Sequence, residues 1–353
     1  MFNLTVLKKH LRKILFTIVV VFVGILIITF FSPKRPTEQT IPSLEREAQK
    51  ISNRDVKDLR WLNNQELAYT FFSEAIKQRA LAKTDGLKET VLFQDVQVKM
   101  SEIYWSKNNN LLIFDYGDPY KTYLFSESAG LKDLGFNGYA FSWSPDGNSF
   151  FFLDIDENGQ ESAKTYETKT DFSTTVNFEV VPFQVSAWSP SGRVILLYNY
   201  NLEIGRGELS LLVLVDNSTK QVSTRNVISP SWAPIEDKLA YAAEGGLYVY
   251  SESEGEQLIY KTNSNPQFIS YNWLNNNELL IFDAEKSPIE FVRLSLQEMV
   301  PRPVFSSLQF QPEQRIKFAI SPNQKIIAVA SEKDGLWFVK NTSNFIPAPS
   351  PAL

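Results

Sequence analysis

The residues of this chain best spaced for chemistry are Asp154, Asp156 and Asn158, which alternate along the sequence and precede Gly159. Oxygen ligands at alternate positions can converge on one calcium ion, and a glycine permits the sharp turn of such a loop. The twelfth position of an EF-hand loop would be Thr165, where a glutamate belongs, and strand-like segments flank the loop instead of helices. The same residue types also form ordinary β-hairpin turns. The spacing therefore leaves two interpretations, a calcium site and, as the simpler one, a hairpin connection.

Composition excludes most other catalytic chemistry. The chain has one histidine, His10, and no cysteine, so its main part cannot supply a Ser-His-Asp triad, a thiolate nucleophile or a metal site of cysteines or histidines. A pair of carboxylates would still suffice for a glycosidase, but the spacing singles out no such pair. We therefore predict no catalytic and no cofactor-binding residues, and expect that the chain is not an enzyme. A carboxylate-dependent, glycan-active enzyme is the alternative.

The elements that would carry these residues repeat along the chain. Six of the seven tryptophans begin the same phrase, in which a polar turn and then an apolar run follow the ring, and a seventh copy begins at an isoleucine. The copies lie 38 to 47 residues apart, a period typical of propeller or solenoid arrays. They begin at Trp61, Trp105, Trp143, Trp188, Trp232, Trp273 and Ile320.

Each copy continues into short apolar runs bounded by turn residues, which is the pattern of strands buried on both faces. Residues 150–153 and 194–198 are two examples. With the short strand that ends at each tryptophan, most copies hold four antiparallel strands, the make-up of a propeller blade. The sequence thus predicts an all-β fold, a seven-bladed β-propeller over residues 55–342. Six blades would remain if the first copy, irregular over residues 74–84, formed none.

The turns after the tryptophans have a recurrent chemistry. In the Ser-Pro-Asp-Gly stretch of residues 144–147, proline fixes φ, aspartate bonds back to the backbone and glycine takes a positive φ. Where asparagines replace this stretch, we expect Asn63 and Asn275 to supply the left-handed conformation.

The W-S-P-D-G phrase of residues 143–147, echoed at residues 188–192, resembles the WD40-like repeat of TolB-type propellers. It also resembles the propeller domain of prolyl oligopeptidase and dipeptidyl peptidase IV relatives. The resemblance spans residues 55–340 and implies the propeller fold. Those peptidase relatives carry their chemistry in an appended α/β-hydrolase domain, which this sequence does not indicate. The motif is structural, so the resemblance implies no particular ligand.

The strands that end at the tryptophans are expected to be innermost and to line the central channel. Four side chains on or beside them could reach a ligand at the channel mouth, unless strand alternation turns them into the core: Arg60, Tyr104, Tyr271 and Lys317. The tryptophans themselves are expected to pack between neighbouring blades, with each indole N–H bound to a nearby acceptor.

An uncharged apolar segment, residues 14–31, precedes the propeller and is close to the length that crosses a bilayer. Residues 1–13 hold four basic side chains and no acid, which favours a cytoplasmic N-terminus. A cleaved signal would need small residues at its end, whereas this segment ends in Thr29, Phe30 and Phe31. We predict a single-pass transmembrane signal anchor with an extracytoplasmic propeller.

The flanking segments are residues 32–54, a linker, and residues 343–353, a proline-rich tail. A propeller must cover its closing edge. Either the linker is only a polar spacer, or residues 41–47 supply the fourth strand of the last blade.

Charge narrows the choice of partner. Beyond residue 13 the chain holds 31 basic and 40 acidic side chains, which makes it a poor partner for nucleic acid. We predict a membrane-anchored binding or scaffolding module for a protein, peptide or glycan. No cofactor is expected, calcium being the one ion weighed, and a calcium-dependent binding protein is a further alternative.

Overall fold

A computed structural model describes residues 48–117, 120–178, 183, 185–201, 206–223, 225–285, 290–306, 316–331 and 335–340. The predicted cytoplasmic flank 1–13, membrane segment 14–31 and proline-rich tail 343–353 lie outside these residues. Within the described residues, no helix is both long enough and apolar enough to cross a membrane.

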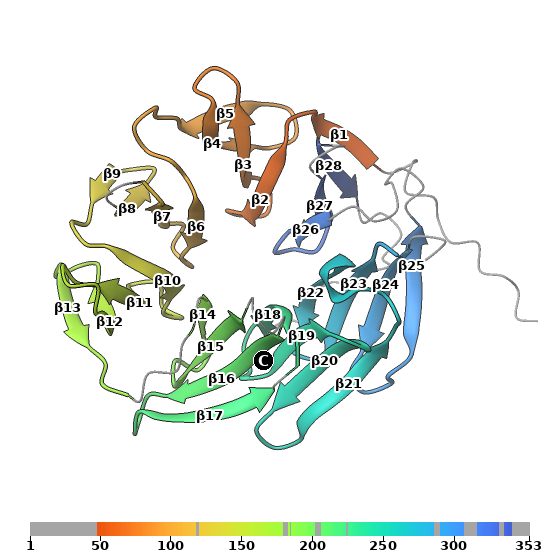
Figure 1. The fold of residues 1–353 in the computed structure, drawn as a ribbon. Coiled ribbons are helices and arrows are strands. Elements are labelled where there is room, and N and C mark those ends of the chain that lie inside the picture. Colours follow the sequence, from red (N-terminus) through yellow and green to blue (C-terminus); the bar gives the residue numbers. More distant parts are fainter. Residues whose placement is uncertain are drawn as a thin grey trace, which may run out of the picture. The chain divides into compact units, whose positions relative to one another are not determined.

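The described residues form seven separate four-stranded antiparallel sheets, which stand as blades around a central axis (Figure 1). In blades 1 to 6 the strands follow chain order from the axis outward, and in blade 7 the outermost strand is the first of the chain. Blade 1 holds β2 (Val56–Trp61), β3 (Leu67–Ser73), β4 (Gln78–Thr84) and β5 (Glu89–Phe93), and blade 2 holds β6 (Glu102–Trp105), β7 (Leu111–Asp115), β8 (Lys121–Ser126) and β9 (Gly130–Asp133). Blade 3 holds β10 (Gly138–Trp143), β11 (Ser149–Ile155), β12 (Glu161–Glu167) and β13 (Phe172–Thr175).

The remaining blades repeat this order. Blade 4 holds β14 (Val185–Trp188), β15 (Val194–Asn201), β16 (Arg206–Val213) and β17 (Ser218–Ser223), and blade 5 holds β18 (Ile228–Trp232), β19 (Leu239–Ala243), β20 (Gly246–Ser251) and β21 (Gly255–Lys261). Blade 6 holds β22 (Ile269–Asn275), β23 (Glu278–Asp283), β24 (Glu290–Ser295) and β25 (Pro301–Ser306), and blade 7 holds β26 (Ile316–Ile320), β27 (Ile326–Ser331), β28 (Gly335–Lys340) and β1 (Ala48–Ser52). The predicted seven-bladed, all-β propeller is confirmed, and the six-blade alternative is wrong because the irregular first copy does form a blade.

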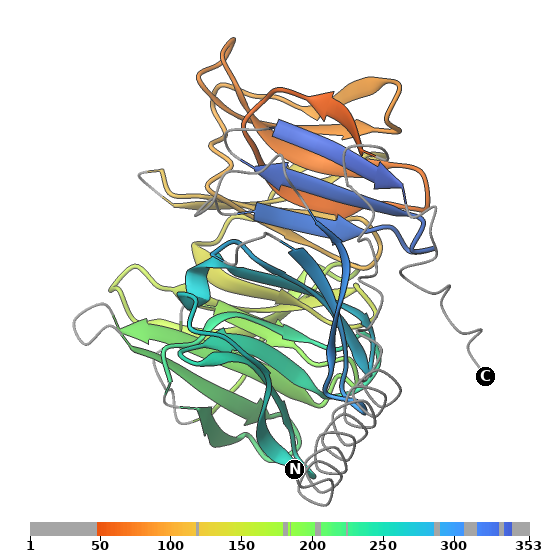
Figure 2. The same ribbon diagram turned by 90° about the vertical axis from the view of Figure 1, so that its right-hand side faces the viewer.

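The last blade is closed by the N-terminal part of the propeller. Strand β1 pairs antiparallel with β28, with Ala48 opposite Val339 and Lys50 opposite Trp337. In Figure 2 this red-orange strand lies beside the blue strands of blade 7. The closing strand thus begins at residue 48, whereas the predicted stretch 41–47 lies outside the described residues, and the propeller begins seven residues before the predicted boundary at 55. Closure covers the edge of β28, which would otherwise present unpaired backbone groups.

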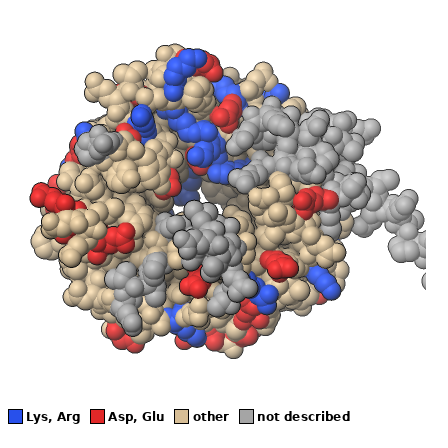
Figure 3. Space-filling view, viewed as in Figure 1, with Lys and Arg blue, Asp and Glu red and all other residues tan. Residues whose placement is uncertain are grey.

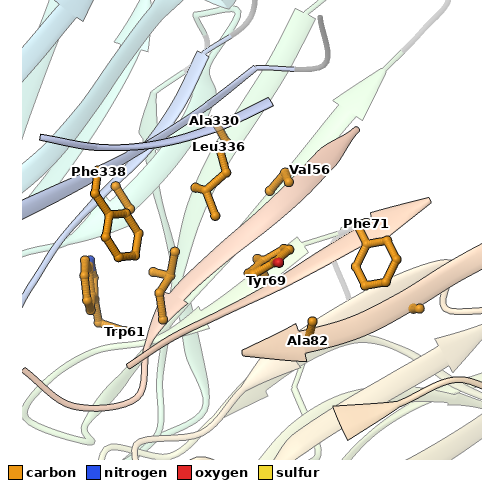
Figure 4. Packing of buried hydrophobic residues seen from close by; sticks show 11 residues of the cluster. Val56, Trp61, Tyr69, Phe71, Ala82, Ala330, Leu336 and Phe338 are labelled. Carbon is orange, nitrogen blue, oxygen red and sulfur yellow. The ribbon is translucent and has the colours of Figure 1, made fainter. Parts of the chain in front are cut away.

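The second strand of each blade forms the centre of the core. All five residues of β7 and all five of β19 are buried, as the continuous apolar runs predict. The buried clusters join residues of adjacent blades. In Figure 4, Trp61 and Tyr69 of blade 1 lie with Leu336 and Phe338 of blade 7 in one such cluster. Apolar packing between blades is therefore what holds the ring together.

A serine after the first strand clamps the turn to the second strand. Ser144 donates its backbone N–H to Ser149 O (2.8 Å), and the Ser144 hydroxyl accepts the N–H of Ser149 (3.1 Å). Equivalent backbone bonds start at Ser106, Ser189 and Ser321. Gly147 has φ +70° in this turn, as predicted.

The turns with asparagine differ from the prediction. Neither Asn63 nor Asn275 has a positive φ. Instead, the Asn63 carboxamide oxygen accepts the N–H groups of Gln65 (2.8 Å) and Glu66 (2.9 Å), and that of Asn275 accepts the N–H of Asn277 (2.8 Å). The side chain replaces the serine clamp, so no left-handed residue is needed at either position.

Candidate functional site

A cavity of about 760 Å³ lies where the first strands of the blades converge on the central axis. Apart from Tyr198 of β15 and Gln267 of the short 3-10 helix η2 (Pro266–Phe268), its walls come from the first strands of blades 1, 2, 5, 6 and 7. The lining residues are Asp58, Leu59, Ile103, Trp105, Tyr198, Ile228, Ser229, Gln267, Ile269, Ser270, Tyr271, Asn272, Ile316, Lys317 and Phe318. Its volume lies within the range typical of ligand pockets, and its lining combines apolar walls with a few polar groups.

The cavity carries one ion pair. Lys317 Nζ lies 3.4 Å from Asp58 Oδ1, and the two side chains are 58% and 30% exposed. Asp58 also accepts a hydrogen bond from the Thr70 hydroxyl (2.7 Å). A solvated pair at this distance contributes little to stability, typically about 0–1 kcal/mol. Both charges can therefore exchange partners with a ligand at small energetic cost.

Lysine and arginine gather on one side of the channel mouth. Figure 3 shows their side chains over β2 and β26, at the rim of the central opening. Strands β2 and β26 hold three basic residues, Lys57, Arg60 and Lys317, and one acid, Asp58; of these, Lys317 and Asp58 line the cavity. This side of the channel is thus locally basic in a chain whose net charge is −5.

The blade 6 side of the cavity is held by bonds across the blade seams. Asn272 donates its side-chain N–H to Phe318 O (2.7 Å), and the Ser270 hydroxyl donates to Ile316 O (2.5 Å). The Tyr271 hydroxyl lies 2.5 Å from Ser229 O and 2.7 Å from Ala240 O. Burial raises the pKa of Tyr271, so its hydroxyl is a donor at neutral pH. These bonds make that wall rigid.

Of the four predicted channel residues, Tyr271 and Lys317 line the cavity, whereas Arg60 and Tyr104 do not. Arg60 donates instead to Ser106 O in blade 2 (3.4 Å), and burial lowers the pKa of its guanidinium. Tyr104 packs on Phe141, with ring centroids 5.4 Å apart. Both side chains lie between blades. This is the alternative given above, in which strand alternation turns a side chain into the core.

The tryptophans fasten blades together, as predicted. Four indole N–H groups donate to the backbone carbonyl of the residue before the equivalent position in the preceding blade, at 2.8–3.2 Å: Trp61 to Ala319, Trp143 to Tyr104, Trp232 to Ala187 and Trp273 to Ser231. Trp188 donates within its own turn, to Gly192 O (3.0 Å). Trp105 has no such bond among the described residues, and it is the one that lines the cavity.

The predicted calcium loop lies between β11 and β12. Asp154 forms an ion pair with Lys164 (2.5 Å), while the Asp156 carboxylate accepts the N–H groups of Asn158 and Gln160 (both 2.8 Å). Those backbone bonds, that of Gln160 foremost, lower the pKa of Asp156. In the described part of the chain, no group of three or more His, Cys, Asp or Glu could hold a metal ion. These contacts are those of a hairpin turn; calcium ligation stays a prediction, and calorimetric titration with calcium is its test.

Sequence reasoning missed several residues of the cavity, chiefly Asp58, Trp105 and Asn272. Asp58 could have been predicted from the sequence, because it lies two residues before Arg60 on the same innermost strand. Asn272 occupies the position before a tryptophan, as Arg60 does, and only the structure shows that it faces the cavity.

No family model and no curated protein matches the sequence. Among solved structures, a puromycin-hydrolyzing peptidase from Mycobacterium tuberculosis matches with a TM-score of 0.56 and 10% identity, over 85% of this chain and 55% of the peptidase. An uncharacterized protein from Listeria monocytogenes EGD-e matches with a TM-score of 0.55 and 11% identity, over 89% of this chain and 100% of that protein. TolB from Acinetobacter baumannii matches with a TM-score of 0.44 and 13% identity, over 86% of this chain and 66% of TolB.

These matches correct one prediction. A peptidase is among the proteins with this propeller, so the prediction that the chain is not an enzyme no longer stands. The chain spans about half the length of that peptidase, and at 10% identity the match concerns the fold. The similarity to the peptidase and to the Listeria protein is therefore one of fold.

Proposed function

We propose that this chain is a membrane-anchored, extracytoplasmic propeller that binds a protein, peptide or glycan partner at its central channel. The observation that supports the proposal best is the cavity of about 760 Å³ between the first strands, with its exchangeable Asp58–Lys317 pair. A rigid ring with a mixed polar and apolar channel suits an extended segment, because such a segment offers both backbone polar groups and apolar side chains.

The first experiment reverses the charge of Lys317. Glutamate there would lie beside Asp58, so we expect about a tenfold loss of partner recovered with the full-length tagged protein from its own membranes. The matched control is Lys325→Glu, which alters an exposed lysine in the turn between β26 and β27, outside the cavity lining. Equal recovery by both variants would show that the channel is not the binding site.

A second experiment tests the proposed location. Because the chain has no cysteine, single cysteines can be labelled without background. We expect a membrane-impermeant maleimide to label Thr174→Cys, at an exposed position of β13, on intact cells. Thr5→Cys, in the predicted cytoplasmic flank, should react only after permeabilisation. The reverse pattern, or labelling of both on intact cells, would overturn the proposed topology.

A further inference from the structure

Two exposed tyrosines stand next to each other where β7 ends and β8 begins. Tyr116 is 54% exposed and Tyr120 is 46% exposed, and their ring centroids lie 6.2 Å apart in an edge-on arrangement. Both rings rest against the buried ring of Phe114, at 4.7 Å and 5.9 Å. Packing on a core residue fixes these rings in place, so they present preorganised aromatic surface to solvent.

A carboxylate completes this cluster. Tyr116 donates its hydroxyl to Glu102 Oε1 (2.7 Å), and Tyr104 donates to Glu102 Oε2. Burial, with the hydrogen bond to Glu102 and its charge, raises the pKa of both phenols, so both stay protonated donors at neutral pH. We call Glu102, Tyr116 and Tyr120 the blade 2 cluster.

The same combination occurs in blade 1, where an arginine of the chain occupies it. The Tyr69 hydroxyl donates to Glu89. Arg54 lies over the ring of Phe71, 4.1 Å from its centroid, and its Nη1 forms an ion pair with Glu89 at 2.7 Å. A guanidinium thus fits an aromatic face and a tyrosine-bound carboxylate at once.

Blade 5 repeats the arrangement with different residues. The Tyr241 hydroxyl donates to Glu256. Arg225 lies over the ring of Tyr248, at 4.8 Å, and its Nε forms an ion pair with Glu256 at 3.1 Å. In two blades, therefore, an arginine of the chain stacks on an aromatic ring and forms an ion pair with a carboxylate that also accepts a tyrosine hydroxyl.

In the blade 2 cluster the carboxylate belongs to the first strand of its blade, whereas Glu89 and Glu256 belong to fourth strands, and the two rings are exposed. Within the described residues, no lysine or arginine forms an ion pair with Glu102, and none stacks on Tyr116 or Tyr120. We propose that the blade 2 cluster binds an arginine side chain of a partner protein, held by the two exposed rings and the Glu102 carboxylate. This inference is independent of the channel: the residues are distinct from the cavity lining, although Ile103, next to Glu102, belongs to it.

A peptide probe tests the proposal on the full-length protein in a nonionic detergent. Acetyl-Gly-Arg-Gly-amide is added to protein with ¹³C-labelled tyrosine rings, and the signals are assigned with Tyr116→Phe and Tyr120→Phe. We expect saturable shifts of these two ring signals, with an affinity about tenfold weaker for the peptide that carries neutral citrulline in place of arginine. The shifts should also weaken with added salt, because the site is solvent-exposed.

Substitutions separate recognition from folding. Glu102→Gln keeps an acceptor for both tyrosines but removes the charge, and we expect about a tenfold weaker affinity for the arginine peptide. Glu161→Gln is the matched control: Glu161 accepts the Tyr139 hydroxyl (2.7 Å) and belongs to no exposed ring pair. Unchanged affinity is expected for this control. Equal affinity for the arginine and citrulline peptides, or for wild type and Glu102→Gln, would overturn the proposal, as would shifts confined to other tyrosines.

Discussion

Replacement of Gly335 by alanine is expected to lower the free energy of unfolding by about 3 kcal/mol. Gly335 begins β28 with φ +76°, and a Cβ there would lie 2.1 Å from Ser52 O in the closing strand β1. Because the Ser52 oxygen belongs to the backbone, the steric clash can be relieved only if β1 moves away from β28. The substitution should therefore open the last blade, and urea unfolding followed by tryptophan fluorescence measures its cost.

A second glycine separates the cost of the steric clash with β1 from the cost of the positive φ. Gly159 has nearly the same φ, +77°, but an added Cβ there would meet no atom within 4 Å. Gly159→Ala should therefore show only the left-handed strain, about 1 kcal/mol. If both variants lost equal stability, the contact between Gly335 and β1 would contribute nothing, and closure would have to depend on other contacts of β1.

The repeat could be predicted because the residues that fix the local structure recur at equivalent positions of the copies. In four copies the tryptophan at the end of the first strand bonds to the preceding blade, and in four a serine after the first strand bonds across the turn to the second strand, so both residue types recur in the sequence. Residues with a fixed local task leave a pattern that one sequence shows without a structure.

The closing strand was harder to place. Its sequence, Ala-Gln-Lys-Ile-Ser, lacks the apolar run that marks the other strands, and Ile51 is its one residue packed on the core cluster. This segment is held in the sheet by backbone hydrogen bonds to the edge of β28. Backbone pairing does not depend on apolar side chains, so the hydropathy of the sequence gives no sign of it. Propensity therefore could not locate β1.

The orientation of the channel residues depends on the phase of side-chain alternation along each first strand and, in β2, also on a register shift. Strand β2 shifts register between Val56 and Leu59, so simple alternation from Trp61 does not predict which side chains of this strand face the axis. Arg60 lies beyond this shift, in regular pairing with Ala68, and bonds to Ser106, whereas Lys317 on the regular strand β26 lines the cavity. Tyr104 lies on β6, which pairs with β7 without a register shift, and it also turns into the seam between blades. A single sequence does not tell which of two alternating side chains faces the axis, so two of the four predicted residues miss the cavity.

Replacement of Trp61 by alanine is expected to lower the free energy of unfolding by about 3–5 kcal/mol. Trp61 is 7% exposed and lies 5.3 Å from the ring of Phe338, across the seam between blades 1 and 7. Its indole N–H donates to Ala319 O (3.1 Å). Alanine would remove both the buried ring and this bond from the seam that closes the ring of blades.

Phenylalanine at position 61 separates the contribution of the buried ring from that of the indole hydrogen bond. Trp61→Phe keeps an aromatic ring but leaves the indole bond unmade, so we expect a smaller loss, about 1–2 kcal/mol. Trp105→Phe is the matched control, since Trp105 makes no indole hydrogen bond among the described residues and should lose less stability than Trp61→Phe. Urea unfolding of the three variants measures the differences. If Trp105→Phe cost as much as Trp61→Phe, ring volume alone would account for the tryptophan repeat, and the bonds between blades would be incidental to it.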